Sequence, residues 1–170
     1  MGAPAGIRDR PGNPCDKEKN KPMAATLQEI LLVPDTQPHV VADCQTLIEQ
    51  EVSALSGVSG AAVKVAYKTA NTFASGYLRS KMEQFVPEMV VQLEPFWADF
   101  GASGSSGFGD YLAKRSDEVC EALLSVTDAH AAISQKPTIL KAYRAVRSGA
   151  AKHVTAALPS LGALVQKYAD

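Results

Sequence analysis

The stretch Ser59–Trp97, SGAAVKVAYKTANTFASGYLRSKMEQFVPEMVVQLEPFW, is the longest helical pattern in the chain. Its apolar residues recur at steps of three and four positions, the spacing of one face of an α-helix. The first half is rich in alanine, and the second half carries methionines, phenylalanines and the only tryptophan of the chain. We therefore expect this stretch to form the core around which the remaining helices pack.

Three residues within the stretch, Gly76, Pro87 and Pro95, are expected to interrupt it. An interior proline removes a backbone hydrogen bond and clashes with the preceding turn. The sequence therefore predicts two or three helical pieces separated by bends. The small side chains of the first half would let a neighbouring helix approach closely.

The rest of the chain shows further helical patterns and no sustained strand alternation. A capping box, Thr26–Glu29, opens a short helix. Further helices are expected over residues 38–56, 110–134, 139–158 and 161–168, with Gly101–Gly109 as a flexible connection and Pro159 as a helix end. These patterns predict an all-α fold, a single-domain bundle of about five to seven helices around a bent central helix.

Composition bounds the class of protein. The chain has 170 residues, 46% hydrophobic and 21% charged, which is typical of one globular domain. Residues 1–22 contain four prolines and no apolar periodicity, so we expect a disordered N-terminal arm before a helical domain over residues 23–170. The net charge of −1 argues against binding nucleic acid through the overall field.

Cysteine use and hydropathy point to a compartment. The three cysteines are far apart along the chain, which suits a reducing environment. No apolar run is long enough to span a bilayer, and the N-terminus lacks the apolar segment of a signal peptide. The sequence therefore predicts a cytoplasmic protein without a transmembrane segment.

Two motifs resemble catalytic signatures without their structural context. Gly101–Gly109 follows a helix instead of a strand and lacks the Gly-Lys-Ser/Thr ending of a phosphate-binding loop. Tyr77 and Lys81 have the spacing of the catalytic pair of short-chain dehydrogenases, but the Rossmann pattern is missing. We interpret the first as a linker and Tyr77 as a core aromatic.

The polar residues of the segment 110–134 suggest a structural histidine. Asp128 and His130 would point in nearly opposite directions on a helix. We therefore interpret His130 as a partly buried histidine that hydrogen-bonds a neighbour such as Tyr143. An enzyme would need the acidic region Asp99–Glu118 to meet His130 or Tyr143 in a cleft. No catalytic residue, metal site or cofactor is predicted, and the protein is expected not to be an enzyme.

Charge is distributed unevenly along the chain. No acidic residue lies between Val52 and Met82 or between Ala129 and Ala169. Lys141, Arg144 and Lys152 share one helix face there, which predicts a basic surface for phosphates, acidic lipid or a protein partner. The alternative is an ordinary solvated face or a face packed against acidic helices. Nucleic acid is the least favoured partner, because no recognised DNA-binding motif is present.

The second half of the central stretch is also a candidate ligand site. Methionine and aromatic side chains line adaptable apolar pockets. The residues concerned are Met82, Phe85, Met89, Phe96 and Trp97. The competing interpretation is that the same side chains fill the core, because their burial ordinarily drives folding.

Several segments resemble an uncharacterised actinobacterial family of small all-helical proteins without an assigned function. They are Pro87–Trp97 (PEMVVQLEPFW), Phe108–Leu112 (FGDYL), Asp117–Val119 (DEV) and Ala156–Pro159 (AALP). The resemblance covers Met23–Asp170 and implies one folded unit and a bacterial cytoplasm. It implies no activity and no site residue.

The sequence favours a non-enzymatic helical interaction or scaffold protein that self-associates or binds a protein partner. The alternative is binding of a hydrophobic or lipid-like small molecule in an inter-helix cavity near Trp97.

Overall fold

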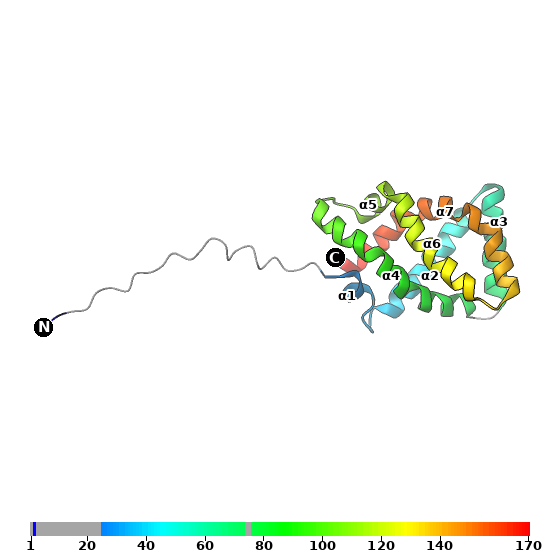
Figure 1. Ribbon diagram of the computed structural model, residues 1–170, viewed down its shortest axis with the longest axis horizontal. Helices are drawn as coiled ribbons and strands as arrows, with labels where there is room; N and C mark the ends of the chain where they lie inside the picture. Colours follow the sequence, from blue (N-terminus) through cyan, green and yellow to red (C-terminus); the bar gives the residue numbers. More distant parts are fainter. Residues whose placement is uncertain (1, 3–24, 74–75) are drawn as a thin grey trace.

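The computed structural model describes residues 2, 25–73 and 76–170, and this part of the chain is helical without a strand (Figure 1). The predicted all-α class is therefore confirmed. The helices are α1 (Leu27–Leu31), α2 (Gln37–Ala54), α3 (Gly57–Phe73), α4 (Tyr77–Ser103), α5 (Phe108–Lys114), α6 (Ser116–Ile133) and α7 (Pro137–Ala169). The disordered arm expected over residues 1–22 lies, apart from Gly2, outside the described residues.

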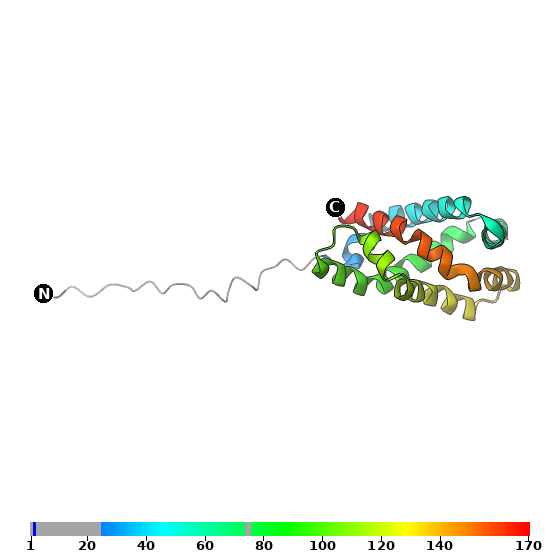
Figure 2. The same ribbon diagram turned by 90° about the horizontal axis from the view of Figure 1, so that it is seen from above.

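The helices form an elongated bundle with α7 running along its length (Figure 2). The C-terminal half of α7 packs against α5 at one end of the bundle, and its N-terminal half packs against α3 at the other (Figure 1). Helices α4 and α6 contact each other along the middle of the bundle, and α1 and α2 lie against α4. None of the described helices is long and apolar enough to cross a membrane.

The capping box at the start of α1 is present as predicted. The backbone N–H of Glu29 donates to Thr26 Oγ1 over 3.2 Å, and the backbone N–H of Thr26 donates to Glu29 Oε2 over 2.9 Å. The carboxylate of Glu94 on α4 also accepts a hydrogen bond from the N–H of Leu27 over 3.0 Å. This anion at a helix N-terminus ties α1 to α4.

The core role expected for Ser59–Trp97 holds for α4 and not for α3. The buried side chains of α4 follow one helical stripe: Met82, Val86, Val90, Leu93 and Phe96. By contrast, Val58 and Val65 on α3 are 91% and 66% exposed. Alanine-rich α3 therefore lies at the edge of the bundle, because it has little apolar surface to bury.

The expected interruption at Gly76 is confirmed, whereas the breaks expected at the prolines are wrong. Gly76 has a φ of 76° and directly precedes α4. Pro87 and Pro95 lie inside α4, and Pro159 lies inside α7. A proline inside a helix costs about 3 kcal/mol. Each buried apolar side chain beside it contributes about 1.5–3 kcal/mol, so the packing outweighs the lost hydrogen bond.

Two other expected boundaries differ from the structure. The helix expected over residues 110–134 is two helices, because the chain turns at Arg115, which has φ −113° and ψ 31°. The expected loop Gly101–Gly109 is shorter, since α4 continues to Ser103 and α5 begins at Phe108. The turn rests on Gly104, which has a φ of 68°, a conformation that glycine adopts without strain.

Helices α5 and α7 touch backbone to backbone at two glycines. A Cβ atom placed on Gly162 would lie 2.2 Å from the Cα atom of Gly109. A Cβ atom on Gly109 would lie 2.5 Å from the carbonyl oxygen of Pro159. These separations leave no room for a methyl group at either position. The contact carries Phe108 into the core, where its side chain is fully buried.

A polar network joins α6 to α7. Asp128 Oδ1 accepts hydrogen bonds from the Tyr143 hydroxyl over 2.6 Å and from Arg147 Nε over 2.7 Å, and Asp128 Oδ2 accepts from Arg147 Nη2 over 2.7 Å. The Arg147 guanidinium, with help from Tyr143, lowers the pKa of Asp128 to about 2. The bidentate geometry therefore favours an ionised carboxylate at this position.

The first prediction concerns the glycine contact. Gly162→Ala should lower the free energy of unfolding by about 3 kcal/mol, because the added methyl group forces α5 away from α7. Gly149→Ala on the same helix is the matched control, since a Cβ atom there meets nothing within 4 Å. The control should stabilise the protein by up to about 1 kcal/mol through helix propensity. Urea denaturation measures both, and equal midpoints for the two variants would contradict the contact.

The second prediction concerns Asp128. Its pKa is lower in the folded chain than in the unfolded chain, so its stabilisation is complete above about pH 4 and is lost as the pH falls towards 2. Asp128→Asn should lower the melting temperature at pH 7 by roughly 2 °C, since exposure to solvent weakens the ion pair. The difference from wild type should shrink below pH 4.

The control for this second prediction is Glu121→Gln. Glu121 is an exposed residue of α6 for which the described part of the chain shows no ion pair or side-chain hydrogen bond. Thermal denaturation followed by circular dichroism between pH 3 and pH 7 compares the variants. A pH-independent effect of Asp128→Asn would show that the Asp128 charge does not stabilise the fold.

Candidate functional site

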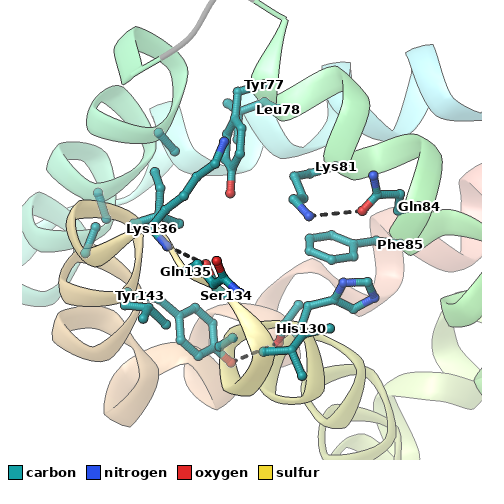
Figure 3. A pocket seen from close by; sticks show the side chains of 18 of the residues that line it. Tyr77, Leu78, Lys81, Gln84, Phe85, His130, Ser134, Gln135, Lys136 and Tyr143 are labelled. Carbon is teal, nitrogen blue, oxygen red and sulfur yellow. Dashed lines mark hydrogen bonds between the residues drawn. The ribbon is translucent and has the colours of Figure 1, made fainter.

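A pocket of about 520 Å³ lies between α3, α4, α6 and α7. The side chains of α4 face those of α6 and α7 across it (Figure 3). Among its described side chains, α3 contributes the small residues Ala66 and Ala70 to the wall. The apolar lining includes Ala66, Ala70, Leu78, Phe85, Leu140 and Val146. This volume is within the range of about 300–1,000 Å³ that small-molecule sites occupy.

Two lysines lie on opposite sides of this pocket (Figure 3). Lys81 on α4 donates to Gln84 Oε1 over 3.0 Å. Lys136, the residue before α7, places its Nζ atom 4.4 Å from the centroid of the Tyr77 ring. This cation–π contact holds the ammonium group at the edge of the pocket. Tyr77 and Lys81, noted in the sequence for their spacing, both line the pocket.

His130 forms part of the pocket wall and pairs with α4. Its side chain is 18% exposed, so the expected partial burial is confirmed. The expected partner was Tyr143, which is wrong: His130 Nε2 lies 2.8 Å from Glu88 Oε1. The imidazole also meets the Phe85 ring edge to face, with centroids 4.6 Å apart. These contacts hold α6 against α4 beside the pocket.

Tyr143 presents its hydroxyl to a different set of groups. The oxygen lies 3.0 Å from Thr127 Oγ1, in addition to its hydrogen bond with Asp128. Burial and the neighbouring Asp128 carboxylate raise the pKa of Tyr143. The hydroxyl is therefore protonated near neutral pH and serves as a donor to Asp128.

The five residues predicted to bind a ligand do not share one cavity. Phe85 lines the 520 Å³ pocket. Met82 and Met89 line a second, largely apolar cavity of about 300 Å³ between α2, α4, α6 and α7. Phe96 and Trp97 line neither. Helical spacing placed the five residues on one segment, but neighbouring helices divide that segment between separate environments.

Trp97 belongs to an aromatic cluster at the α5 end of the bundle. Its ring packs edge to face on Phe108 with centroids 5.0 Å apart, and at a tilt of 36° on Phe100 with centroids 5.5 Å apart. Its indole N–H donates to the carbonyl oxygen of Ala25 over 3.1 Å. These contacts agree with the alternative interpretation, in which the aromatic residues fill the core.

The second cavity contains one buried polar atom without a partner in the described part of the chain, His153 Nε2. Cys44 lines the same cavity, and burial raises the pKa of its thiol to about 11. Cys120 is buried and lies 3.2 Å from Thr155 Oγ1. The described residues include no group of three or more histidine, cysteine or acidic side chains that could hold a metal.

The predicted basic surface is divided by the structure. Lys141 and Arg144 line a groove that shares Ser134, Gln135 and Leu140 with the 520 Å³ pocket. Lys152 is exposed further along α7 and lines neither. Lys81 and Lys136 were not predicted from the sequence to share a site. The signal that pointed towards them is the absence of acidic residues from both lysine-containing segments.

The acidic region Asp99–Glu118 does not meet His130 or Tyr143. Asp99 and Glu118 instead bind Arg115, over 2.9 Å and 2.7 Å. That ion pair lowers the pKa of Glu118. Glu118 and His130 are separated by roughly 18 Å along α6. Glu118 therefore does not contact His130.

Comparison with known proteins identifies a family but no individual relative. The match covers residues 27–169, which contain all of the described helices from α1 to α7. No curated protein and no solved structure matches the chain. The actinobacterial origin expected from the sequence stays a prediction. The chain belongs to the family of unknown function DUF6918.

Proposed function

We propose that the protein binds a small hydrophobic molecule in the pocket between α3, α4, α6 and α7. The observation that carries this proposal is the pocket itself, an opening of about 520 Å³ with a mainly apolar lining and a few polar side chains. Apolar walls supply affinity, at about 0.8 kcal/mol for each buried methylene group, and the polar groups orient the ligand.

The pocket is preferred over the second cavity because its wall includes residues that are exposed to solvent. The smaller cavity is lined by core side chains such as Leu31, Val90 and Leu158, which stabilise the fold. The lining of the larger pocket includes Ile133, which is 77% exposed, and Lys136, which is also exposed. A ligand can therefore enter it from solvent without displacing the core.

The third prediction tests this binding with decanol, a neutral probe. Wild-type protein should bind decanol, and Ala142→Phe should weaken binding by at least about tenfold, because the ring fills the space that the alkyl chain needs. Ala145→Phe is the matched control: it is exposed on the same helix and does not line the pocket. Isothermal titration calorimetry measures the affinities, and melting temperatures verify folding.

Two results would contradict the proposal. One is the absence of decanol binding to the wild-type protein. The other is equal decanol affinity for Ala142→Phe and Ala145→Phe, which would place the alkyl chain elsewhere. Trp97 fluorescence is a poor reporter for this test, because Trp97 packs in the aromatic cluster and does not line the pocket.

A second candidate function is self-association through α3. Val58 and Val65 are exposed and lie two turns apart on one face of the helix. The exposed residues Ala61 and Ala62 lie between them. The small, uncharged side chains at these four positions suit close packing against the same helix of a second chain. The cytoplasmic location and bacterial origin expected from the sequence stay predictions.

The fourth prediction follows from this α3 face. Light scattering after size exclusion should give a mass above the 18.0 kDa of one chain at micromolar concentration. The double variant Val58→Lys/Val65→Lys should return the mass to that of one chain, because association would bury two lysines without an acidic partner. Lysine at exposed Ala156 on α7 is the control. A wild-type protein that stays at one-chain mass would remove this candidate.

A further inference from the structure

The charged residues that line the 520 Å³ pocket are all positive among the described residues. Among the described residues that line it, Lys81 and Lys136 are cationic and none is a carboxylate. The two lysines lie more than fifty positions apart in the chain and come from different helix ends. The fold therefore brings two positive charges to the same apolar opening.

The acidic groups near the pocket already have partners. Glu88 is bound to His130, and both oxygens of Asp128 are bound to Arg147, one of them also to Tyr143. Helix α3 contains no acidic residue, and neither does α7. Neither helix supplies a carboxylate that could neutralise the lysines of the pocket.

The positive charge continues beyond the opening. The adjoining groove, which shares part of the pocket wall, carries Lys141 and Arg144 and has no acidic lining residue. Clefts lined by charges of one sign raise the local concentration of ligands of the opposite sign. The potential at the opening thus favours an anion.

We propose that the ligand of this pocket is an anionic amphiphile. Its alkyl chain lies among Phe85, Leu140 and Val146, and its carboxylate or phosphate head lies at the opening between Lys81 and Lys136. This inference rests on the proposed function and adds the chemical class of the ligand. The ammonium of Lys81 has three donors, of which the bond to Gln84 uses one.

The position of each lysine supports a role in head-group binding. Gln84 and Phe85 hold the Lys81 ammonium on the α4 side, where its Nζ atom lies 5.9 Å from the Phe85 ring centroid. Tyr77 holds the Lys136 ammonium on the opposite side (Figure 3). Both cations are thus preorganised by contacts within the protein, which lowers the entropy cost of binding.

The fifth prediction compares three probes with the same chain length: decanoate, decyl phosphate and decanol. Both anions should bind wild-type protein about five- to tenfold more tightly than decanol at low salt, since partly exposed charge pairs contribute modestly. Lys81→Met/Lys136→Met should remove this preference, because it weakens binding of the two anions more than binding of decanol. Isothermal titration calorimetry at pH 7.5 measures all nine probe and protein combinations.

The third protein in this comparison is Lys152→Met, the matched control. Lys152 is an exposed lysine of α7 outside the pocket and the groove, so its substitution should preserve the preference for anions. A second readout uses only wild-type protein, in case the double variant fails to fold. Raising the sodium chloride concentration should weaken decanoate binding and leave decanol binding nearly constant.

The outcomes separate this inference from the proposed function. Equal affinity of wild-type protein for decanol and decanoate would overturn the anionic class while leaving hydrophobic binding in place. A preference that persists in the double lysine variant, or that is insensitive to salt, would also overturn it. Failure of all three probes to bind would overturn the proposed function itself. The tighter of the two anions would identify the head group.

Discussion

The backbone contact between α5 and α7 is the constraint on which the bundle depends. Gly109 and Gly162 approach so closely that neither position has room for a Cβ atom. The contact inserts Phe108 beneath Trp97 and Phe100, and the backbone N–H of Phe108 donates to Gln166 Oε1 over 2.8 Å. Hydrophobic burial and hydrogen bonding thus join the end of α4, α5 and α7 into one rigid unit.

The N-terminal half of α7 packs less closely against its neighbours. There α3 contributes alanines, and the rest of the wall includes Lys81, Lys136 and the rings of Tyr77, Phe85 and Tyr143. The result is an open pocket instead of a close helix contact. Most buried side chains lie on α4, α5, α6 and the second half of α7. The fold therefore tolerates a pocket beside the first half of α7. A binding site supported by such a core can stay preorganised.

The predictions from sequence succeeded where the cause is local. The capping box at Thr26 and the interruption at Gly76 depend on neighbouring residues and on backbone conformation, and both are present. The breaks expected at Pro87 and Pro159 failed, because contacts with distant helices outweigh a local cost of about 3 kcal/mol. The ligand cluster was predicted from helical spacing alone, and spacing carries no information on which neighbouring helix faces each residue.

The amino-acid sequence predicts the all-α class, because apolar residues at helical spacing can be buried together only on a helix. It also determined that two segments would lack acidic residues. Helix packing brings Lys81 and Lys136 to one opening and places Trp97 in a separate aromatic cluster. The physical reason is that contacts between residues distant in the chain depend on how whole helices pack, down to the space left by two glycines at one crossing.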